Sequence, residues 1–150
     1  LRQLVGFEPV YQPDFNFAYD VVDVIAEKEP VRRAMLWCNE AGEEHTFTFS
    51  EISKASNRAA NLFSSLGISR GDRVLLILKR HYQFWFALLG LHKLGAVGIP
   101  ATNQLTKKDI AYRCNAAGIK AVICTTDGDV AEHVDTALPE CPTVEIKISG

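Results

Sequence analysis

The sequence predicts an α/β fold, in which alternating strands and helices form a mostly parallel, helix-flanked sheet. Residues 74–78 (VLLIL) are an unbroken apolar run, which is typical of a strand covered on both faces. From residue 50 onward, helical and strand-like segments alternate over short loops, which favours parallel strands joined by right-handed crossovers. We therefore expect residues 50–150 to form an α/β subdomain, preceded over residues 1–49 by an arm, a helix and a β-hairpin.

The N-terminal part contains three kinds of segment. Residues 1–16 are aromatic and punctuated by prolines, which predicts an arm that lies over another surface. Residues 17–28 have apolar positions at helical spacing, with Asn16 as a suitable N-cap. Residues 34–38 and 45–49 are strand-like and flank a glycine-containing turn, which predicts the hairpin.

Glycines mark the ends of the predicted helices. We expect Ser50 to cap a helix that ends before Gly67. Gly95 and Gly118 likewise follow helical segments and precede apolar runs. Each glycine is expected to adopt the left-handed conformation that stops a helix and returns the chain to the sheet.

The remaining elements follow from the same signals. Thr106 is expected to cap a helix, with Asp109 in a capping-box position. Residues 129–138 are expected to form the last helix and residues 144–148 the last strand.

The helix predicted over residues 82–94 is apolar on nearly every side. It is too short to span a bilayer, and a helix that is apolar all round belongs inside a larger protein. We therefore expect Leu76 in the central strand and Trp85 in this helix to be core residues. The same argument indicates that the chain is only part of something larger.

The composition is that of an ordinary globular protein, with 47% hydrophobic residues, 23% charged residues and a formal net charge of -2. It offers no basic stripe for nucleic acid and no polybasic patch for a membrane. The first residues show no secretory signal pattern, and no segment predicts a transmembrane helix. We expect a cytoplasmic protein with no nucleic-acid partner.

The four cysteines are not arranged as a metal site. None forms a C-x-x-C pair, and no histidine lies at metal-ligand spacing from them. We expect reduced and mostly buried thiols. The cysteines are Cys38, Cys114, Cys124 and Cys141.

Phosphate-binding loops are not predicted, because Gly67-x-x-x-Gly71 and Gly95-x-x-Gly98 precede strands, whereas a phosphate loop follows a strand and opens a helix. Arg70-Gly71-Asp72 is interpreted as a helix-to-strand turn.

Polar segments follow the predicted strands at residues 79–81, 100–105 and 125–127. Ligands of open α/β sheets favour that edge. We prefer residues 100–105 as a ligand contact. His81 is interpreted as a structural or solvent-facing residue, and the residues by themselves contain no complete catalytic constellation.

Most of the chain resembles the amino-terminal part of the adenylate-forming superfamily of acyl-CoA synthetases, and most closely its acetyl- and medium-chain branch. The resemblance covers about two-thirds of the chain in unbroken order, and its specificity lies in the set of motifs. These motifs are T-F-S-E (48–51), N-x-x-A-N (57–61), L-G-I-x-x-G-D-R-V (66–74), H-K-L-G-A-V-x-I-P (92–100) and D-I-x-Y-R (109–113).

The resemblance implies an ATP-dependent acid–CoA ligase, which converts a carboxylic acid, ATP and coenzyme A to acyl-CoA, AMP and pyrophosphate through an acyl-adenylate. ATP, Mg²⁺ and coenzyme A are then co-substrates of the parent protein. The family's phosphate loop and catalytic lysine lie downstream of this chain. The resemblance therefore implies an N-terminal subdomain fragment of a larger enzyme. Such a fragment contains no catalytic residue and no metal ligand, and we expect it to be inactive alone.

The same resemblance places one contact in the chain, a wall of the coenzyme A tunnel at Thr102, Asn103, Gln104 and Leu105. Asn-Gln stands where some relatives have Gly-Gly, which is a departure from the family pattern. The alternative function is a free-standing α/β binding or interaction module without catalysis. A module should hide the helix over residues 82–94, whereas a fragment should expose an apolar face or self-associate through it.

Overall fold

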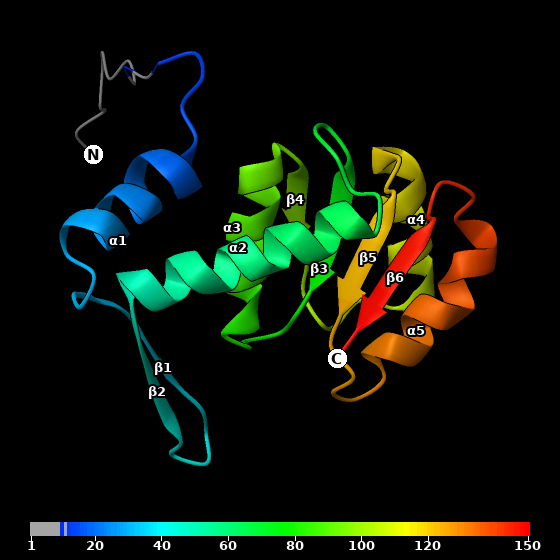
Figure 1. Ribbon diagram of the computed structural model, residues 1–150. Coiled ribbons are helices and arrows are strands. Elements are labelled where there is room, and N and C mark those ends of the chain that lie inside the picture. The colour runs from blue at the N-terminus through cyan, green and yellow to red at the C-terminus, as the bar shows by residue number, and fades with distance from the viewer. Residues whose placement is uncertain (1–9, 11) are drawn as a thin grey trace, which may run out of the picture.

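The computed structural model describes residue 10 and residues 12–150 (Figure 1). The arm expected over residues 1–16 therefore lies largely outside the described residues. The N-terminal helix consists of a π-helical turn, η1 (Ala18–Asp23), continued by α1 (Val24–Lys28). The Asn16 carboxamide oxygen accepts hydrogen bonds from the backbone N–H groups of Ala18 and Tyr19, at 3.0 and 3.4 Å. This confirms its expected role at the start of the helix.

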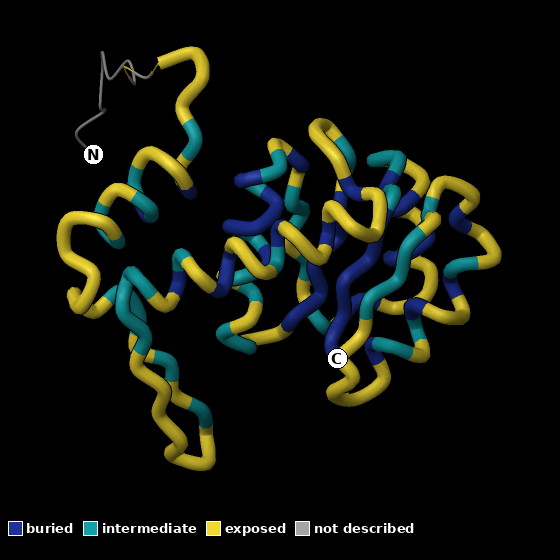
Figure 2. Tube along the Cα trace, in the orientation of Figure 1, coloured by how far each residue is buried: buried dark blue, intermediate teal, exposed yellow. Residues whose placement is uncertain are grey.

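The predicted hairpin is a separate two-stranded antiparallel sheet. Its strands are β1 (Arg33–Cys38) and β2 (Glu44–Thr48). The hairpin projects away from the main sheet in Figure 1, and most of its residues are at least partly exposed (Figure 2).

The main sheet has four parallel strands in the order β4-β3-β5-β6. The alternating, parallel arrangement predicted from the sequence is confirmed. The strands are β3 (Arg73–Ile77), β4 (Val97–Pro100), β5 (Ala121–Cys124) and β6 (Ile146–Ser149). The helices are α2 (Phe49–Ser65), α3 (Gln83–Leu94), α4 (Lys107–Ala117), α5 (Val130–Ala137) and the 3₁₀ turn η2 (Leu138–Glu140).

Helices cover both faces of this sheet. Successive side chains of a strand point to opposite faces, so each strand contributes to two cores. In β3, Leu75 and Ile77 belong to the core shared with α4 and α5. Val74 and Leu76 belong to the core shared with α2 and α3. The two central strands, β3 and β5, are consequently the most continuously buried part of the chain (Figure 2).

The N-cap of α2 is Thr48, so the prediction of Ser50 is wrong. The Thr48 hydroxyl accepts a hydrogen bond from the Glu51 N–H at 3.3 Å, and the Glu51 carboxylate accepts one from the Thr48 N–H at 2.8 Å. The hydrogen bonds that the Glu51 carboxylate accepts from the Thr48 N–H and from the Thr48 hydroxyl hold the pKa of Glu51 below its usual range. Phe49 already belongs to the helix, although it continues the alternating pattern of β2. At α4, Thr106 and Asp109 form the expected capping box.

The predicted glycine stops are confirmed at all three helices. Gly67, Gly95 and Gly118 have φ values of 91°, 67° and 58°. After α2, the Ile68 N–H bonds back to the Phe63 carbonyl at 3.0 Å, which completes a Schellman ending. The Asp72 carboxylate closes the following turn through the Ser69 N–H and the Lys120 ammonium group, both at 2.8 Å. The hydrogen bond from Lys120 lowers the pKa of Asp72.

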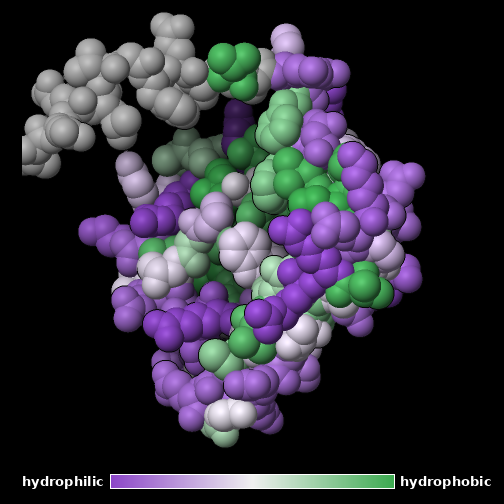
Figure 3. Space-filling view, turned by 90° about the vertical axis from the view of Figure 1, so that its left-hand side faces the viewer, coloured by the Kyte–Doolittle hydropathy of each residue, from purple (hydrophilic) through white to green (hydrophobic). Residues whose placement is uncertain are grey.

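Helix α3 is buried on two sides but not all round, so the expectation of a core Trp85 is wrong. Ala87 and Leu91 are buried against the sheet, whereas Trp85 is 50% exposed. The helix packs against α2 and the sheet, and η1 covers part of it through Ala18 and Val22, whereas the side that carries Trp85 faces outward. Val97 at the edge strand β4 is also exposed. Figure 3 shows one side of the molecule, on which patches of apolar surface lie among polar side chains.

Helices α2 and α3 pack so closely that Gly90 has no room for a side chain. A Cβ atom there would lie 2.9 Å from the Ala59 Cβ, 3.0 Å from the Ala60 N and 3.1 Å from the Ser56 O. We therefore expect Gly90→Ala to lower the free energy of unfolding by about 1–3 kcal/mol. This loss is expected even though alanine favours a helix over glycine by about 1 kcal/mol. Urea denaturation measures this change. Asn61→Ala on the exposed side of α2 is the control, and a more stable Gly90→Ala variant would contradict the packing.

Candidate functional site

The carboxyl ends of β3 and β5 form the topological switch point of the sheet. The connection after β3 leads outward to β4, and the next connection returns across β3 to β5. Open α/β sheets bind ligands outside the carboxyl ends of their strands, at the point where the winding reverses. Residues 79–81 and 125–127 lie at this point.

Side chains from the two strand ends contact each other there. His81 Nε2 lies 2.9 Å from the Thr125 hydroxyl and 3.3 Å from an Asp127 carboxylate oxygen. Asp127 also lies 3.6 Å from the Lys79 ammonium nitrogen, and its N–H bonds to the Thr125 hydroxyl at 3.1 Å. His81 thus joins the two loops, which agrees with its structural interpretation, while its side chain keeps 33% of its surface exposed.

The turn after β3 has an unusual backbone. The His81 N–H bonds to the Leu78 carbonyl at 3.1 Å, and Lys79 has φ 50°. Lys79 is the one residue other than glycine with positive φ in the described part of the chain. A left-handed residue that carries a Cβ costs about 1–2 kcal/mol. Such strained residues cluster at binding and catalytic sites.

A hollow of about 690 Å³ is lined by residues of this turn and of the β-hairpin. This volume is within the range of small-molecule sites, about 300–1,000 Å³. The Trp37 indole N–H donates a 2.6 Å hydrogen bond to the Arg80 carbonyl, which fixes the hairpin against the turn. Trp37 and Tyr82 pack edge to face with ring centroids 5.4 Å apart. We call this hollow the hairpin crevice, and its lining comprises Trp37, Cys38, Asn39, Glu40, Ala41, Glu43, Lys79, Arg80, His81 and Asp127.

The four residues expected along a coenzyme A tunnel are only partly together on the surface. Thr102 is exposed and lines a second hollow of about 360 Å³ beside Leu78 and Pro100. Asn103 is half-buried and Gln104 is exposed, and the Gln104 N–H bonds to the Thr102 hydroxyl at 3.3 Å. Leu105 points into the core and is 6% exposed, so its side chain is not available to a ligand.

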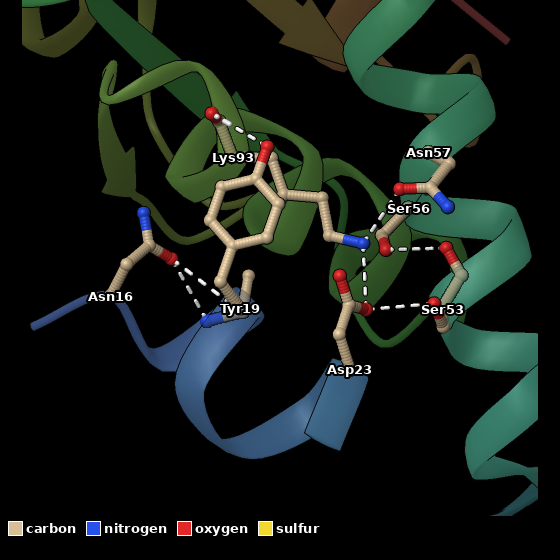
Figure 4. A network of polar contacts seen from close by, with 8 residues as sticks. Asn16, Tyr19, Asp23, Ser53, Ser56, Asn57 and Lys93 are labelled. Atoms are coloured by element: carbon tan, nitrogen blue, oxygen red, sulfur yellow. Dashed lines mark hydrogen bonds and ion pairs between the residues drawn. The ribbon is translucent and has the colours of Figure 1, made fainter. Parts of the chain in front are cut away.

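A second polar cluster lies away from the sheet edge, around Lys93 (Figure 4). The Lys93 ammonium group donates to the carboxylate of Asp23 at 2.8 Å and to the carboxamide oxygen of Asn57 at 2.7 Å. Only 2% of the Lys93 side chain is exposed, and the Tyr19 ring centroid lies 5.6 Å from its nitrogen. Since the Lys93 ammonium group is bonded to both Asp23 and Asn57, the cluster joins the N-terminal helix to α2 and α3, and we interpret it as a structural contact.

The buried cysteines do not add reactive chemistry. All four are free, and only Cys38 is exposed. Burial raises the pKa of the Cys114 thiol to about 12, which suppresses the reactive thiolate. The described residues also contain no group of histidine, cysteine and carboxylate side chains placed to hold a metal ion. Among the helices of the described residues, none is both long and apolar enough to cross a membrane.

Comparison with known families gives a match over residues 22–149, to the family described as AMP-binding enzyme. The chain belongs to the AMP-binding enzyme family. The resemblance found in the sequence motifs is thereby confirmed.

Curated members of this family are similar along nearly the whole chain. The mitochondrial acyl-coenzyme A synthetase ACSM5 of Rattus norvegicus is 38% identical over 89% of this chain, which covers 24% of that protein. The mitochondrial acyl-coenzyme A synthetase ACSM2A of Homo sapiens is 36% identical over 98% of this chain and 27% of its own length. The chain thus spans about a quarter of the length of these AMP-binding relatives.

Solved structures confirm the fold. A fatty acyl CoA synthetase of Mycobacterium tuberculosis superposes with a TM-score of 0.79 at 24% identity, over 90% of this chain and 26% of that chain. The inhibitor-bound N-terminal domain of FACL13 from the same organism gives the same TM-score, over 90% of this chain and 33% of that chain. At this level of identity, these AMP-binding structures establish the α/β architecture alone.

Two features of the sheet edge were not identified from the sequence. The strand end at 125–127 was noted, but its contact with His81 depends on the parallel pairing of β3 and β5. Trp37 lies in the hairpin, and nothing local indicates that it bonds to the turn after β3. The hairpin crevice is therefore a property of the tertiary structure.

Proposed function

We propose that the protein containing this chain is an ATP-dependent acid–CoA ligase. The observation that carries the proposal is the family match over residues 22–149, together with relatives named acyl-coenzyme A synthetases at 36–38% identity. A carboxylate oxygen attacks the α-phosphorus of ATP and releases pyrophosphate. The coenzyme A thiol then attacks the acyl carbon and releases AMP, which retains the bridging oxygen.

In this reaction the chain supplies scaffold and one substrate contact. The surface loop formed by Thr102, Asn103 and Gln104 follows β4 at the ligand-binding edge of the sheet. The exposed carboxamide of Gln104 can bond to the amide groups of a pantetheine arm. ATP, Mg²⁺ and the carboxylic acid are proposed as co-substrates of the whole protein, and the isolated chain is proposed to be inactive.

Exposed apolar surface supports a part of a larger enzyme over a free-standing module. A complete module should hide helix α3, yet Trp85 is 50% exposed and Val97 is 46% exposed. We expect the isolated chain to self-associate through this surface at high concentration. Detection of a clean monomer by native mass spectrometry would instead favour the free-standing module.

The cellular location stays a prediction. The composition led us to expect a cytoplasmic protein, whereas the relatives ACSM5 and ACSM2A are named as mitochondrial. Fractionation of cells that express the tagged full-length protein decides between the two.

The test of the proposed function is acid-dependent pyrophosphate release by the full-length protein with ATP and Mg²⁺. Addition of coenzyme A should convert the product to a thioester. Release of orthophosphate in place of pyrophosphate would contradict the ligase assignment.

The coenzyme A contact has its own prediction. We expect Gln104→Ala in the full-length protein to raise the KM for coenzyme A about 3–10-fold, which corresponds to the loss of one neutral hydrogen bond. Acid-dependent pyrophosphate release without coenzyme A should not change. Lys108→Ala on the exposed start of α4 is the control, and an unchanged KM in Gln104→Ala would remove this loop from the coenzyme A site.

A further inference from the structure

We propose that the hairpin crevice is a binding site for a phosphate-bearing small molecule, held at the turn after β3. This site is distinct from the loop at Thr102–Gln104, and the inference does not rest on the ligase activity.

The first argument is the charge of the turn. Lys79 and Arg80 are adjacent cations that line the hairpin crevice. Arg80 has no ion-pair partner among the described residues, and Lys79 has only Asp127, at 3.6 Å. Both members of that pair are about half exposed, so their mutual attraction is weak and a phosphate can compete for the ammonium group. Guanidinium and ammonium groups are the side chains that proteins use to bind phosphate.

The second argument is the backbone. Within the part of the chain that the structure describes, the N–H groups of Lys79 and Arg80 donate to no other residue. They belong to a turn in which Lys79 is left-handed. Successive free N–H groups beside a left-handed residue are the elements of an anion-binding nest. The strained conformation thus leaves two donors uncommitted, next to two cationic side chains.

The third argument is the rigidity of the setting. The Arg80 carbonyl accepts a hydrogen bond from the Trp37 indole at 2.6 Å, and His81 is tied to Thr125 and Asp127. The carboxyl end of the turn is therefore held in place, so a ligand does not have to order its backbone there. Preorganisation of this kind lowers the entropic cost of binding.

The crevice is also polarised, which gives the ligand an orientation. Glu40 and Glu43 line it from the hairpin, whereas Lys79 and Arg80 line it from the turn, where Asp127 is the one carboxylate among the described lining residues. The phosphate is therefore expected at the turn, with the uncharged part of the ligand toward Trp37 and the hairpin. Glu40 should weaken phosphate binding by repulsion, in contrast to Lys79 and Arg80.

The test is isothermal titration calorimetry of this chain with inorganic pyrophosphate at low ionic strength. We expect saturable binding that Lys79→Gln/Arg80→Gln weakens at least tenfold, since a hydrogen bond to a charged group contributes more than the 1.4 kcal/mol of a tenfold change. Glu40→Gln should strengthen binding about 2–5-fold, because it removes a nearby like charge.

The matched control is Lys54→Gln/Arg58→Gln, which removes the same amount of positive charge from the exposed face of α2. It should change pyrophosphate binding less than about twofold.

Several results would overturn the proposal. They are no binding at millimolar pyrophosphate, equal binding by Lys79→Gln/Arg80→Gln, equal weakening by the control, or no gain from Glu40→Gln. Since Glu40→Gln is expected to gain affinity, a folding defect cannot imitate its result. A parallel titration with ADP distinguishes two possible sources of the phosphate. If ADP binds more tightly than pyrophosphate, the ligand is a nucleotide; if ADP binds equally or more weakly, the ligand is a free phosphate.

Discussion

Replacement of Leu76 by alanine is expected to lower the free energy of unfolding by about 3–5 kcal/mol. Leu76 lies in the central strand β3, is 0% exposed and packs in the core formed with α2 and α3. Removing its side chain leaves a cavity in a well-packed core, and that is the costliest kind of large-to-small change. Since a domain of this size has a total stability of about 5–15 kcal/mol, the variant should unfold at a much lower urea concentration.

Trp85→Ala is the informative comparison for Leu76→Ala. On sequence grounds both residues were expected to leave core cavities, but Trp85 is 50% exposed and Leu76 is not exposed. The larger tryptophan should therefore cost less than the smaller leucine in the isolated chain. Equal losses, or a loss below about 1 kcal/mol for Leu76→Ala, would contradict the observed burial.

Lys93→Ala is expected to have the second large effect, a loss of about 3 kcal/mol at most, because it breaks an ion pair whose ammonium group is buried and whose Asp23 carboxylate is 27% exposed. The Asp23 carboxylate and the Asn57 carboxamide would lose the ammonium group that now lies 2.8 and 2.7 Å away (Figure 4). Asp23 would keep its bond to the Ser53 hydroxyl at 2.7 Å. The N-terminal helix should then detach more readily, which limited proteolysis after α1 detects together with urea denaturation.

An exposed ion pair provides the control. Lys107 and Glu140 are both about half exposed, and an exposed pair contributes about 0–1 kcal/mol. Lys107→Ala should therefore leave both the urea midpoint and the proteolysis pattern nearly unchanged. A double-mutant cycle of Lys93→Ala with Asp23→Ala should give a coupling energy of about 0.5–3 kcal/mol. No coupling would show that the contact does not hold the N-terminal helix.

The parts of the fold that sequence reasoning predicted are those that depend on neighbours in the chain. Gly67, Gly95 and Gly118 end helices as expected, because a left-handed residue after a helix is favourable for glycine alone. The box of Thr106 and Asp109 was predicted for the same local reason. Thr48 was missed because Phe49 continues the alternation of a strand while already helical.

The parts that sequence reasoning missed depend on tertiary contacts. Lys93 is a residue type that is usually exposed on a helix. Its burial depends on the approach of Tyr19 and Asp23 from the N-terminal helix and of Asn57 from α2. Trp85 is a residue type that is usually found in a core, but it stays 50% exposed because no element among the described residues covers its side of α3. The candidate site follows the same rule, since the sheet edge could be predicted from strand order, whereas the hairpin crevice depends on the Trp37–Arg80 bond.

The most direct test of the proposed chemistry uses a carboxylic acid labelled with ¹⁸O in both carboxylate oxygens. The full-length protein is incubated with this acid, ATP, Mg²⁺ and coenzyme A, and the products are analysed by mass spectrometry. An acid–CoA ligase that works through an acyl-adenylate transfers one labelled oxygen to AMP and keeps the other in the thioester. Unlabelled AMP, or formation of ADP and phosphate, would contradict the proposed function.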